Sequence, residues 1–342
     1  MECMKLMPGI RAIQVAAFGG PEALVPVTLD VPVPGEGQAV IAVSVADVLF
    51  LDTLIRSGRF GGSFPVALPY VPGNGVAGHV VATAPGVDSG WAGQRVVAHT
   101  GAHGGSDGYA ERVAVPAERL VPVPDGLDLP VAAAVLHDGP TALGLMTRIG
   151  ARAGEWVLVL GAAGGLGLLL VQLARAAGAR VIGAARTAGI PRADEKLNAI
   201  VKAGAEIVVD YNSPTWTAQV LGATGGAGPD VVFDGVGGQL GRAAFAITAV
   251  GGRFSQHGAS GGGFAGISPS MAAERQVRVQ GIEQAQYAPG QREELVGRAL
   301  ADAAAHRIEP VSGQVVPLEE AARAHAAIAA RAVIGKTLLT VG

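Results

Sequence analysis

Hydrophobic and polar positions follow two different patterns along the chain. The first third consists of short valine-rich runs, such as 39–46, 78–84 and 94–99, separated by proline and glycine. Runs of this length between turn residues predict a barrel-like or sandwich β domain. From about residue 130, alanine- and leucine-rich stretches with helical spacing alternate with short apolar runs. That alternation predicts βαβ units and a parallel sheet.

The second pattern is long enough for a complete doubly wound sheet of six strands. The predicted strands are 156–160, 180–184, 206–209, 230–233, 252–256 and 276–281, and the helices between them are 166–177, 195–203, 218–223 and 240–249. Helices at 291–307 and 319–331 and a strand at 335–341 follow. This last segment is too short for a domain of its own, so we expect it to complete the first one.

Composition and charge exclude several classes of protein. The 342 residues are 49% hydrophobic and 15% charged, with a net charge of -3 and no basic cluster, which argues against nucleic-acid binding. The most apolar segment, 157–171, is shorter than the roughly 20 residues of a spanning helix, and four glycines interrupt it. The N-terminus lacks the apolar core of a signal peptide. We therefore expect a cytoplasmic protein that binds neither nucleic acid nor membranes.

A glycine-rich loop follows the first strand of the predicted parallel sheet. Gly161, Gly164 and Gly167 have the spacing G-x-x-G-x-x-G and precede a helix. Glycines at such a junction allow a tight turn and bring the backbone close to a pyrophosphate. The N–H groups at the start of the helix, near Gly165 and Leu166, attract the same anion. The loop predicts a dinucleotide site.

The end of the second strand indicates which dinucleotide binds. Sites for NAD usually place an acidic residue there to bind the ribose 2′-hydroxyl. This chain has Arg186 instead and no acid in "GAARTAG". A cation suits a 2′-phosphate, which predicts NADPH; the alternative is that Arg186 is a solvated surface residue.

Several motifs, taken in order, resemble those of the medium-chain dehydrogenase/reductase superfamily, and within it the zinc-free quinone oxidoreductase branch that includes zeta-crystallin. They are "DTLIRSGRF", "VPGNGVAGHV", "GPTALG", "LVLGAAGGLG", "DVVFDGVGG", "GGRFSQHGASG" and "IGKTLL". The resemblance implies an α/β protein with a GroES-like β-rich catalytic domain plus a Rossmann doubly wound parallel sheet. The expected boundaries are 1–128 for the catalytic domain, 129–282 for the NADP-binding domain and 283–342 for the segment that completes the catalytic domain. It also implies a homodimer that pairs through the edge strand at 276–282.

The resemblance implies that the catalytic zinc of other superfamily members is absent. The three ligand positions correspond to Leu49, Asn74 and His137. Leucine cannot ligate a metal and asparagine is a poor zinc ligand, so one histidine leaves no site. Cys3 is the chain's sole cysteine, which also excludes a thiolate-rich structural zinc site.

Cofactor and substrate positions carry over from the same branch. The implied cofactor contacts are Ala163, Gly164, Gly165, Leu166 and Gly167 in the loop, Lys196 and Tyr211 at the 2′-phosphate, and Thr141 with the backbone at Gly235 and Val236 at the nicotinamide. The Asn and two Tyr that many members hold in the substrate cleft correspond to Leu49, Leu54 and Phe60, and a Glu corresponds to Gly75. The pocket is therefore expected to be more apolar than usual.

The expected reaction is zinc-independent hydride transfer from NADPH to a quinone or another conjugated carbonyl or activated alkene. A conjugated acceptor spreads the developing charge, so a hydrogen-bond donor can replace the metal. His137 and Asn74 are the leading donors, and Tyr70, Thr141, His99 and His103 are further candidates. Asp138 is expected at a turn or helix start, and Asp52 with Arg56 as a structural pair. The alternatives are 2-enoyl or 2-alkenal reduction, or an NADPH-binding module with little turnover.

Overall fold

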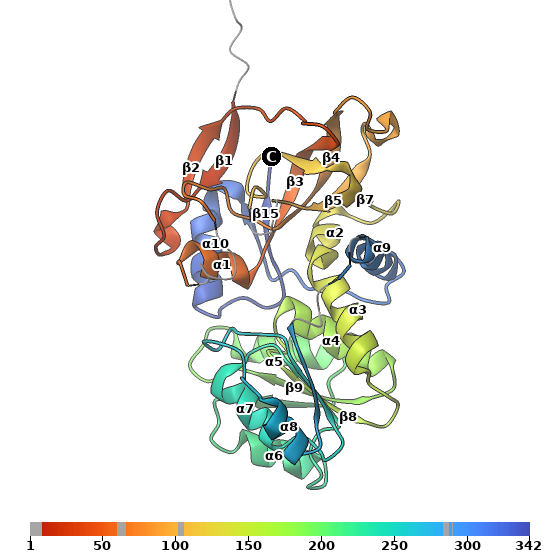
Figure 1. The fold of residues 1–342 in the computed structure, drawn as a ribbon. Helices are drawn as coiled ribbons and strands as arrows, with labels where there is room; N and C mark the ends of the chain where they lie inside the picture. Colours follow the sequence, from red (N-terminus) through yellow and green to blue (C-terminus); the bar gives the residue numbers. More distant parts are fainter. Residues whose placement is uncertain (1–8, 60–65, 102–105, 283–286, 289) are drawn as a thin grey trace, which may run out of the picture. The chain divides into compact units, whose positions relative to one another are not determined.

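The computed structural model describes residues 9–59, 66–101, 106–282, 287–288 and 290–342, which form two compact units (Figure 1). The first unit contains the chain up to His137 together with Val296–Ala305 and Ser312–Gly342. The second unit contains Asp138–Leu295 and His306–Val311. No helix in the described ranges is long and apolar enough to cross a membrane.

The first unit is built on an antiparallel framework in which distant segments of the chain pair. Within the described ranges, a seven-stranded sheet has the order β14-β15-β3-β4-β5-β7, with β6 paired to β3. Strand β15 pairs with β3 through Thr337↔Val48, so the C-terminal segment enters the sheet of the N-terminal one. The strands are β3 (Gln38–Val48), β4 (Gly75–Thr83), β5 (Arg95–His99), β6 (Arg112–Pro116), β7 (Val121–Pro122), β14 (Gln314–Pro317) and β15 (Thr337–Thr340), with β1 (Ile10–Gln14) and β2 (Val25–Leu29) in a separate pair.

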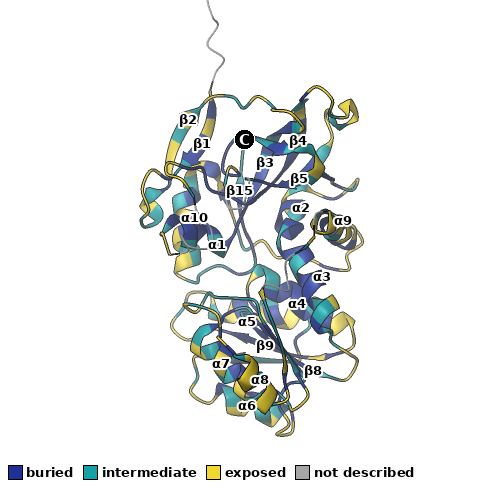
Figure 2. Cartoon of the chain, viewed as in Figure 1, coloured by how far each residue is buried: buried dark blue, intermediate teal, exposed yellow. Residues whose placement is uncertain are grey.

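Helix α2 (Leu129–Leu136) covers part of this framework with apolar residues. The last five residues of α2 are buried, and α2 packs on β3, β4 and β5. The helices of the first unit are α1 (Phe50–Arg56), α2 (Leu129–Leu136), α9 (Gln291–Ala304), which begins in the second unit, and α10 (Ala321–Ala329). Figure 2 shows β3 of this unit and β9 (Arg180–Ala185) of the second unit as largely buried.

The second unit is a parallel sheet with helices between its strands. Among the described residues it has six strands in the order β10-β9-β8-β11-β12-β13. The strands are β8 (Trp156–Leu160), β9 (Arg180–Ala185), β10 (Ile207–Asp210), β11 (Val231–Asp234), β12 (Arg253–Gln256) and β13 (Arg278–Gly281), and the helices are α3 (Asp138–Ile149), α4 (Gly165–Ala176), α5 (Ala193–Lys202), α6 (Trp216–Ala223), α7 (Gly238–Ala246) and α8 (Pro269–Glu274). The predicted strands are confirmed to within about two residues at each end, as expected for elements with a strong apolar pattern. Helix α8 was missed, because six residues are too few to show a helical period.

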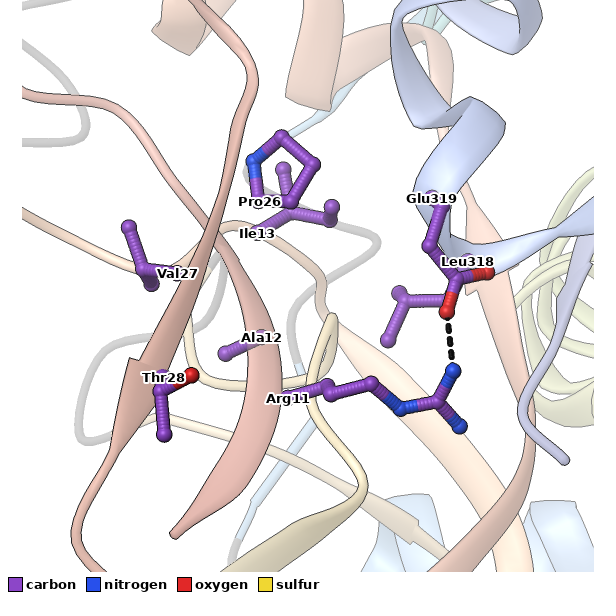
Figure 3. A pocket seen from close by; sticks show the side chains of 8 residues that line it. All are labelled: Arg11, Ala12, Ile13, Pro26, Val27, Thr28, Leu318 and Glu319. Atoms are coloured by element: carbon purple, nitrogen blue, oxygen red, sulfur yellow. Dashed lines mark hydrogen bonds and ion pairs between the residues drawn. The ribbon is translucent and has the colours of Figure 1, made fainter.

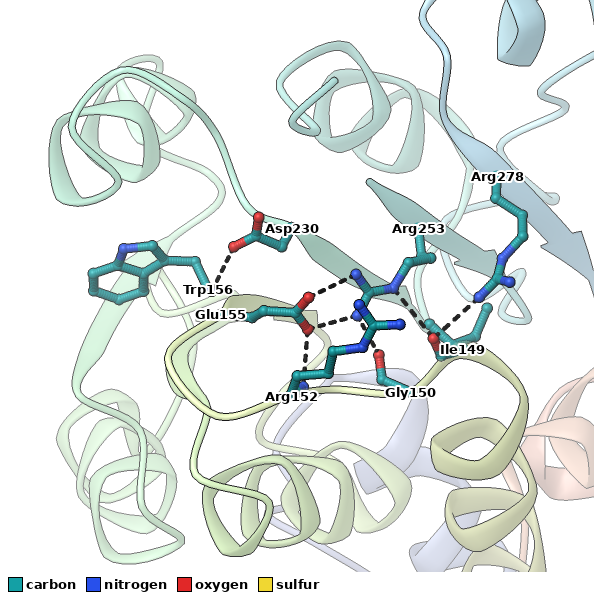
Figure 4. Close-up of polar contacts among 8 residues, drawn as sticks. All are labelled: Ile149, Gly150, Arg152, Glu155, Trp156, Asp230, Arg253 and Arg278. Carbon is teal, nitrogen blue, oxygen red and sulfur yellow. Dashed lines mark hydrogen bonds and ion pairs between the residues drawn. The ribbon is translucent and has the colours of Figure 1, made fainter. Parts of the chain in front are cut away.

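The amino-terminal ends of the central strands are joined by an ion pair. Arg253, at the start of β12, donates to both oxygens of Glu155 at 2.8 and 2.6 Å and to the carbonyl of Gly150 at 2.7 Å (Figure 4). Hydrogen bonds from Arg253 lower the pKa of Glu155. Both side chains are mostly buried, so this bidentate pair is shielded from solvent and holds the sheet at the edge away from the glycine loop.

A buried polar cluster joins three distant segments of the first unit. Asp52 Oδ2 accepts hydrogen bonds from the Leu49 N–H at 2.8 Å and from the Tyr109 hydroxyl at 3.1 Å. The same hydroxyl lies 3.0 Å from Nε2 of His325 on α10. Burial raises the pKa of Asp52 to about 7 and lowers the pKa of His325 to about 3.

Asp52 and Arg56 are both buried, as suits structural residues, but within the described chain they have different partners. Among the described residues no ion pair joins them, because Asp52 turns toward the start of α1 while Arg56 donates to the carbonyl of Gly19 at 2.8 Å. The spacing of the motif did not reveal this.

We predict that Asp52→Asn stabilises the protein increasingly as pH rises. The carboxyl has a folded-state pKa above its unfolded value, so its contribution to the free energy of unfolding is present below about pH 4 and is lost as pH rises to about 7. The difference in unfolding free energy between variant and wild type should therefore grow over that range and level off above it. Urea unfolding at several pH values measures this difference, with the exposed Asp30→Asn as the control. A difference that stays flat from pH 4 to 7 would show that Asp52 is ionised throughout.

Candidate functional site

Three loops lie side by side at the carboxyl edge of the parallel sheet. Leu160, Asp234 and Gln256 are in register across β8, β11 and β12, so the loops that begin at Gly161, Gly235 and His257 are neighbours. The strand order reverses between β8 and β11. In open α/β sheets, ligands bind in the crevice at this reversal.

The glycine loop between β8 and α4 depends on a close backbone contact. Gly161 has a φ of 72°, and the Gly164 N–H donates to its carbonyl at 3.0 Å. A Cβ on Gly167 would lie 2.3 Å from the same carbonyl oxygen, so any larger residue would push α4 away from the strand. No side chain caps α4 at Gly164, which leaves the first N–H groups of the helix for an anion. The loop therefore fits a pyrophosphate.

A second turn packs against the glycine loop. Asp234, fully buried at the end of β11, accepts hydrogen bonds through Oδ1 from the N–H groups of Val236 at 3.0 Å and Gly237 at 2.7 Å. Burial raises the pKa of Asp234 to about 6. The buried Val236 side chain lies over Gly161, where a Cβ would meet it at 3.4 Å. Sequence reasoning missed Asp234, although an acid that ends a buried strand before Gly-Val-Gly-Gly was a usable signal.

Two of the residues predicted at the 2′-phosphate follow paired strands, β9 and β10. Arg186 follows β9 and is exposed, and Tyr211 follows β10 and donates its N–H to the Ala185 carbonyl at 3.2 Å. Lys196 lies in the first turns of α5 and is buried, so it differs from Arg186 in its exposure.

The structure also places an acid at this edge, which sequence reasoning missed. Asp210 ends β10, and its carboxylate accepts hydrogen bonds from the N–H groups of Ala188 at 2.9 Å and Asn212 at 2.8 Å. Burial opposes ionisation, but these N–H donors outweigh it and lower the pKa of Asp210. The carboxylate shapes the turn after Arg186.

In the first unit, the three predicted zinc-ligand positions lie at the ends of β3, β4 and α2. Leu49 follows β3 and Asn74 precedes β4, and Asp47↔Gly75 are paired between them. The Asn74 carbonyl accepts from the Thr100 N–H at 2.8 Å, just past β5. His137 ends α2, whose Leu136 side chain lies against Gly75.

These positions do not suit zinc. Leu49 offers no donor atom and an Asn amide is a weak one, and the described ranges hold no group of three or more His, Cys, Asp or Glu side chains arranged around a metal. Instead, a second imidazole is present: His99 lies with its ring centroid 6.2 Å from that of His137, edge to face. His99, at the end of β5, is buried, and His137 is half-buried.

The remaining predicted residues have different surroundings. Leu54 is half-buried on α1, and Tyr70 is buried with no hydrogen-bond partner for its hydroxyl within the described chain. Thr141 lies in the first turn of α3, which begins at Asp138, so Asp138 is a helix-start residue. Phe60 and His103 lie outside the described residues.

A surface cavity of about 230 Å³ lies elsewhere in the first unit (Figure 3). It is lined by Arg11, Ala12, Ile13, Pro26, Val27, Thr28, Leu318 and Glu319. Arg11 forms ion pairs with Glu319 and, at 2.7 Å, with Glu111. None of the predicted site residues lines this cavity, and its wall is held together by exposed ion pairs of small energetic weight.

The sequence is similar to known proteins over nearly all of its length. A family model for the alcohol dehydrogenase GroES-like domain matches residues 35–125, and one for zinc-binding dehydrogenases matches residues 165–299. The quinone oxidoreductase of Rattus norvegicus is 32% identical, covering 92% of this chain and 93% of its own. That of Pseudomonas aeruginosa is 32% identical, covering 96% and 99%.

Two solved structures extend the comparison to the fold. A mycobacterial protein complexed with NADPH has a TM-score of 0.84 and 33% identity, covering 97% of this chain and 100% of that one. The quinone oxidoreductase of Escherichia coli complexed with NADPH has a TM-score of 0.86 and 28% identity, with coverage of 97% and 100%. The chain therefore belongs to the medium-chain dehydrogenase/reductase superfamily, in its quinone oxidoreductase branch, and has the GroES-like domain and Rossmann-like parallel sheet that its motifs predicted.

Proposed function

We propose that this protein is an NADPH-dependent oxidoreductase that transfers hydride to a quinone or another conjugated carbonyl or activated alkene. The observation that carries the proposal is the carboxyl edge of the parallel sheet. There a glycine loop leads into the uncapped start of α4, and Arg186 and Tyr211 follow the next two strands, β9 and β10. Relatives named quinone oxidoreductases and neighbours solved with NADPH support the same activity.

The second unit supplies the residues that bind the cofactor. The loop from Gly161 to Gly167 and the start of α4 bind the pyrophosphate through backbone N–H groups. Arg186, Lys196 and Tyr211 bind the 2′-phosphate. Thr141, Gly235 and Val236 orient the nicotinamide ring, which supplies the hydride when the cofactor is bound.

The first unit supplies the substrate pocket in this proposal. Its lining includes Leu49, Leu54 and Tyr70. Phe60, which the resemblance also assigns to the pocket, lies outside the described residues. His137 and Asn74 donate hydrogen bonds to the acceptor oxygen. A conjugated acceptor delocalises negative charge, so hydrogen-bond donors are sufficient where a simple ketone would need a metal. The reaction is therefore zinc-independent.

Assembly and location complete the proposal. The protein acts in the cytoplasm as a homodimer that pairs along β13, where Ile282 is exposed next to the strand. The proposed domains are the catalytic domain at 1–128, the NADP-binding domain at 129–282 and the segment that completes the catalytic domain at 283–342. Light scattering distinguishes the dimer from a monomer.

The proposed reaction is tested with a panel of acceptors. Purified protein should oxidise NADPH in the presence of quinones, and added chelator should not reduce the rate. Greater activity on 2-enoyl thioesters or 2-alkenals would assign the alternative reductase activity. Tight NADPH binding without turnover on any acceptor would indicate a binding module and contradict hydride transfer.

We predict that Arg186→Ala weakens NADPH binding about tenfold and leaves NADH binding unchanged. One charge-assisted hydrogen bond to a phosphate contributes about 1.5–3 kcal/mol, and NADH lacks the 2′-phosphate. Titration calorimetry with both dinucleotides measures the effect, and the exposed Arg298→Ala, on α9, is the control. Equal weakening of both dinucleotides would contradict a role at the 2′-phosphate.

We predict that His137→Ala lowers kcat about 5- to 150-fold and leaves the Kd for NADPH unchanged. The imidazole is assigned to the acceptor oxygen, so its loss costs about 1–3 kcal/mol in the transition state. His137→Gln, which keeps a donor, should recover part of the loss. Unchanged turnover in His137→Ala would identify His137 as a packing residue.

A further inference from the structure

His257 is a polar residue at the carboxyl edge of the parallel sheet that the proposed function has not used. It is the first residue after β12 and is half-buried. Its backbone N–H and that of Gly258 donate to the carbonyl of Asp234, at 3.2 and 3.0 Å. These bonds attach the start of the β12 loop to the turn that contains Gly235 and Val236.

The imidazole of His257 has a defined orientation. Nδ1 lies 2.9 Å from the hydroxyl of Ser255, a buried residue two positions earlier on β12. A Cβ on Gly235 would lie 3.5 Å from Nε2, so the ring reaches over Gly235 toward the middle of the three loops. Within the described part of the chain, no hydrogen bond is made by Nε2.

The strand order indicates which half of the dinucleotide meets this imidazole. Arg186 and Tyr211, assigned to the 2′-phosphate, follow β9 and β10 on one side of the strand reversal. His257 follows β12 on the other side. A dinucleotide with its pyrophosphate at the β8–α4 loop and its adenosine over β9 has its nicotinamide nucleoside over β11 and β12.

The charge state of His257 fits an uncharged partner. Burial lowers the pKa of its imidazole to about 4, so the ring is neutral at pH 7. A neutral ring with Nδ1 engaged by Ser255 presents Nε2 as one hydrogen-bonding atom, a donor or an acceptor according to the tautomer. The nicotinamide nucleoside offers both kinds of partner, in its carboxamide and its ribose hydroxyls.

We propose that His257 is a further cofactor-binding residue, whose Nε2 forms a hydrogen bond with the nicotinamide nucleoside of NADPH. Ser255 is the positioning residue that holds the ring. The inference rests on the proposed function, because it takes NADPH as the ligand and its pyrophosphate at the glycine loop.

The test compares a complete ligand with one that lacks the nicotinamide nucleoside. NADPH and adenosine 2′,5′-bisphosphate are titrated by calorimetry into wild type, His257→Val, His257→Gln and Ser255→Ala. We expect His257→Val to weaken NADPH about tenfold, the size of one net hydrogen bond, with the bisphosphate unaffected. His257→Gln should recover part of the affinity, and Ser255→Ala should lose less than His257→Val.

The outcomes separate this inference from the proposed function. Unchanged NADPH affinity in His257→Val would overturn the inference alone, because wild type would still bind NADPH. Equal weakening of both ligands would also overturn it, since His257 would then only shape the loop. Wild type that binds neither ligand would overturn the proposed function together with the inference.

Discussion

Direct contact between backbones at the carboxyl edge of the parallel sheet is the constraint on which the rest of the site depends. Gly167 meets the carbonyl of Gly161, and Gly258 is so close to Gly235 that a Cβ would lie 2.1 Å from its carbonyl group. A side chain at either position would clash with this backbone and force the loops apart. Because these glycines are present, the loops after β8, β11 and β12 form one continuous surface.

Each unit is stabilised internally by a buried carboxylate, and the two carboxylates have different kinds of partner. In the second unit Asp234 uses backbone N–H groups to shape the turn beside the glycine loop. In the first unit Lys336 and Asp47 form a buried ion pair at 2.7 Å that joins β15 to β3. Removing either Lys336 or Asp47 would leave the other as an uncompensated buried charge, which would destabilise the first unit.

Sequence reasoning succeeded where the signal is local and failed where it depends on distant neighbours. The strand at Trp156–Leu160 and the helix after the glycine loop have their own apolar periods, and both form nearly where predicted. The partners of Asp52 and Arg56 were not predicted, because Tyr109 and the Gly19 carbonyl come from other segments of the chain. His257 was overlooked because its partners, Ser255 and the Gly235 turn, are brought to it by strand pairing.

The sequence by itself determined the alternation of strands and helices, the glycine loop, the cation after β9 and the membership of the superfamily. Each of these is written in residues that are neighbours along the chain, where backbone geometry and apolar period decide the outcome. The tertiary structure alone decided that β15 enters the sheet beside β3, that His99 faces His137, and that Asp210 closes the turn after Arg186. Those features depend on strand order and register, which bring together side chains from distant segments. The local sequence of one such segment does not indicate which other segment will pair with it.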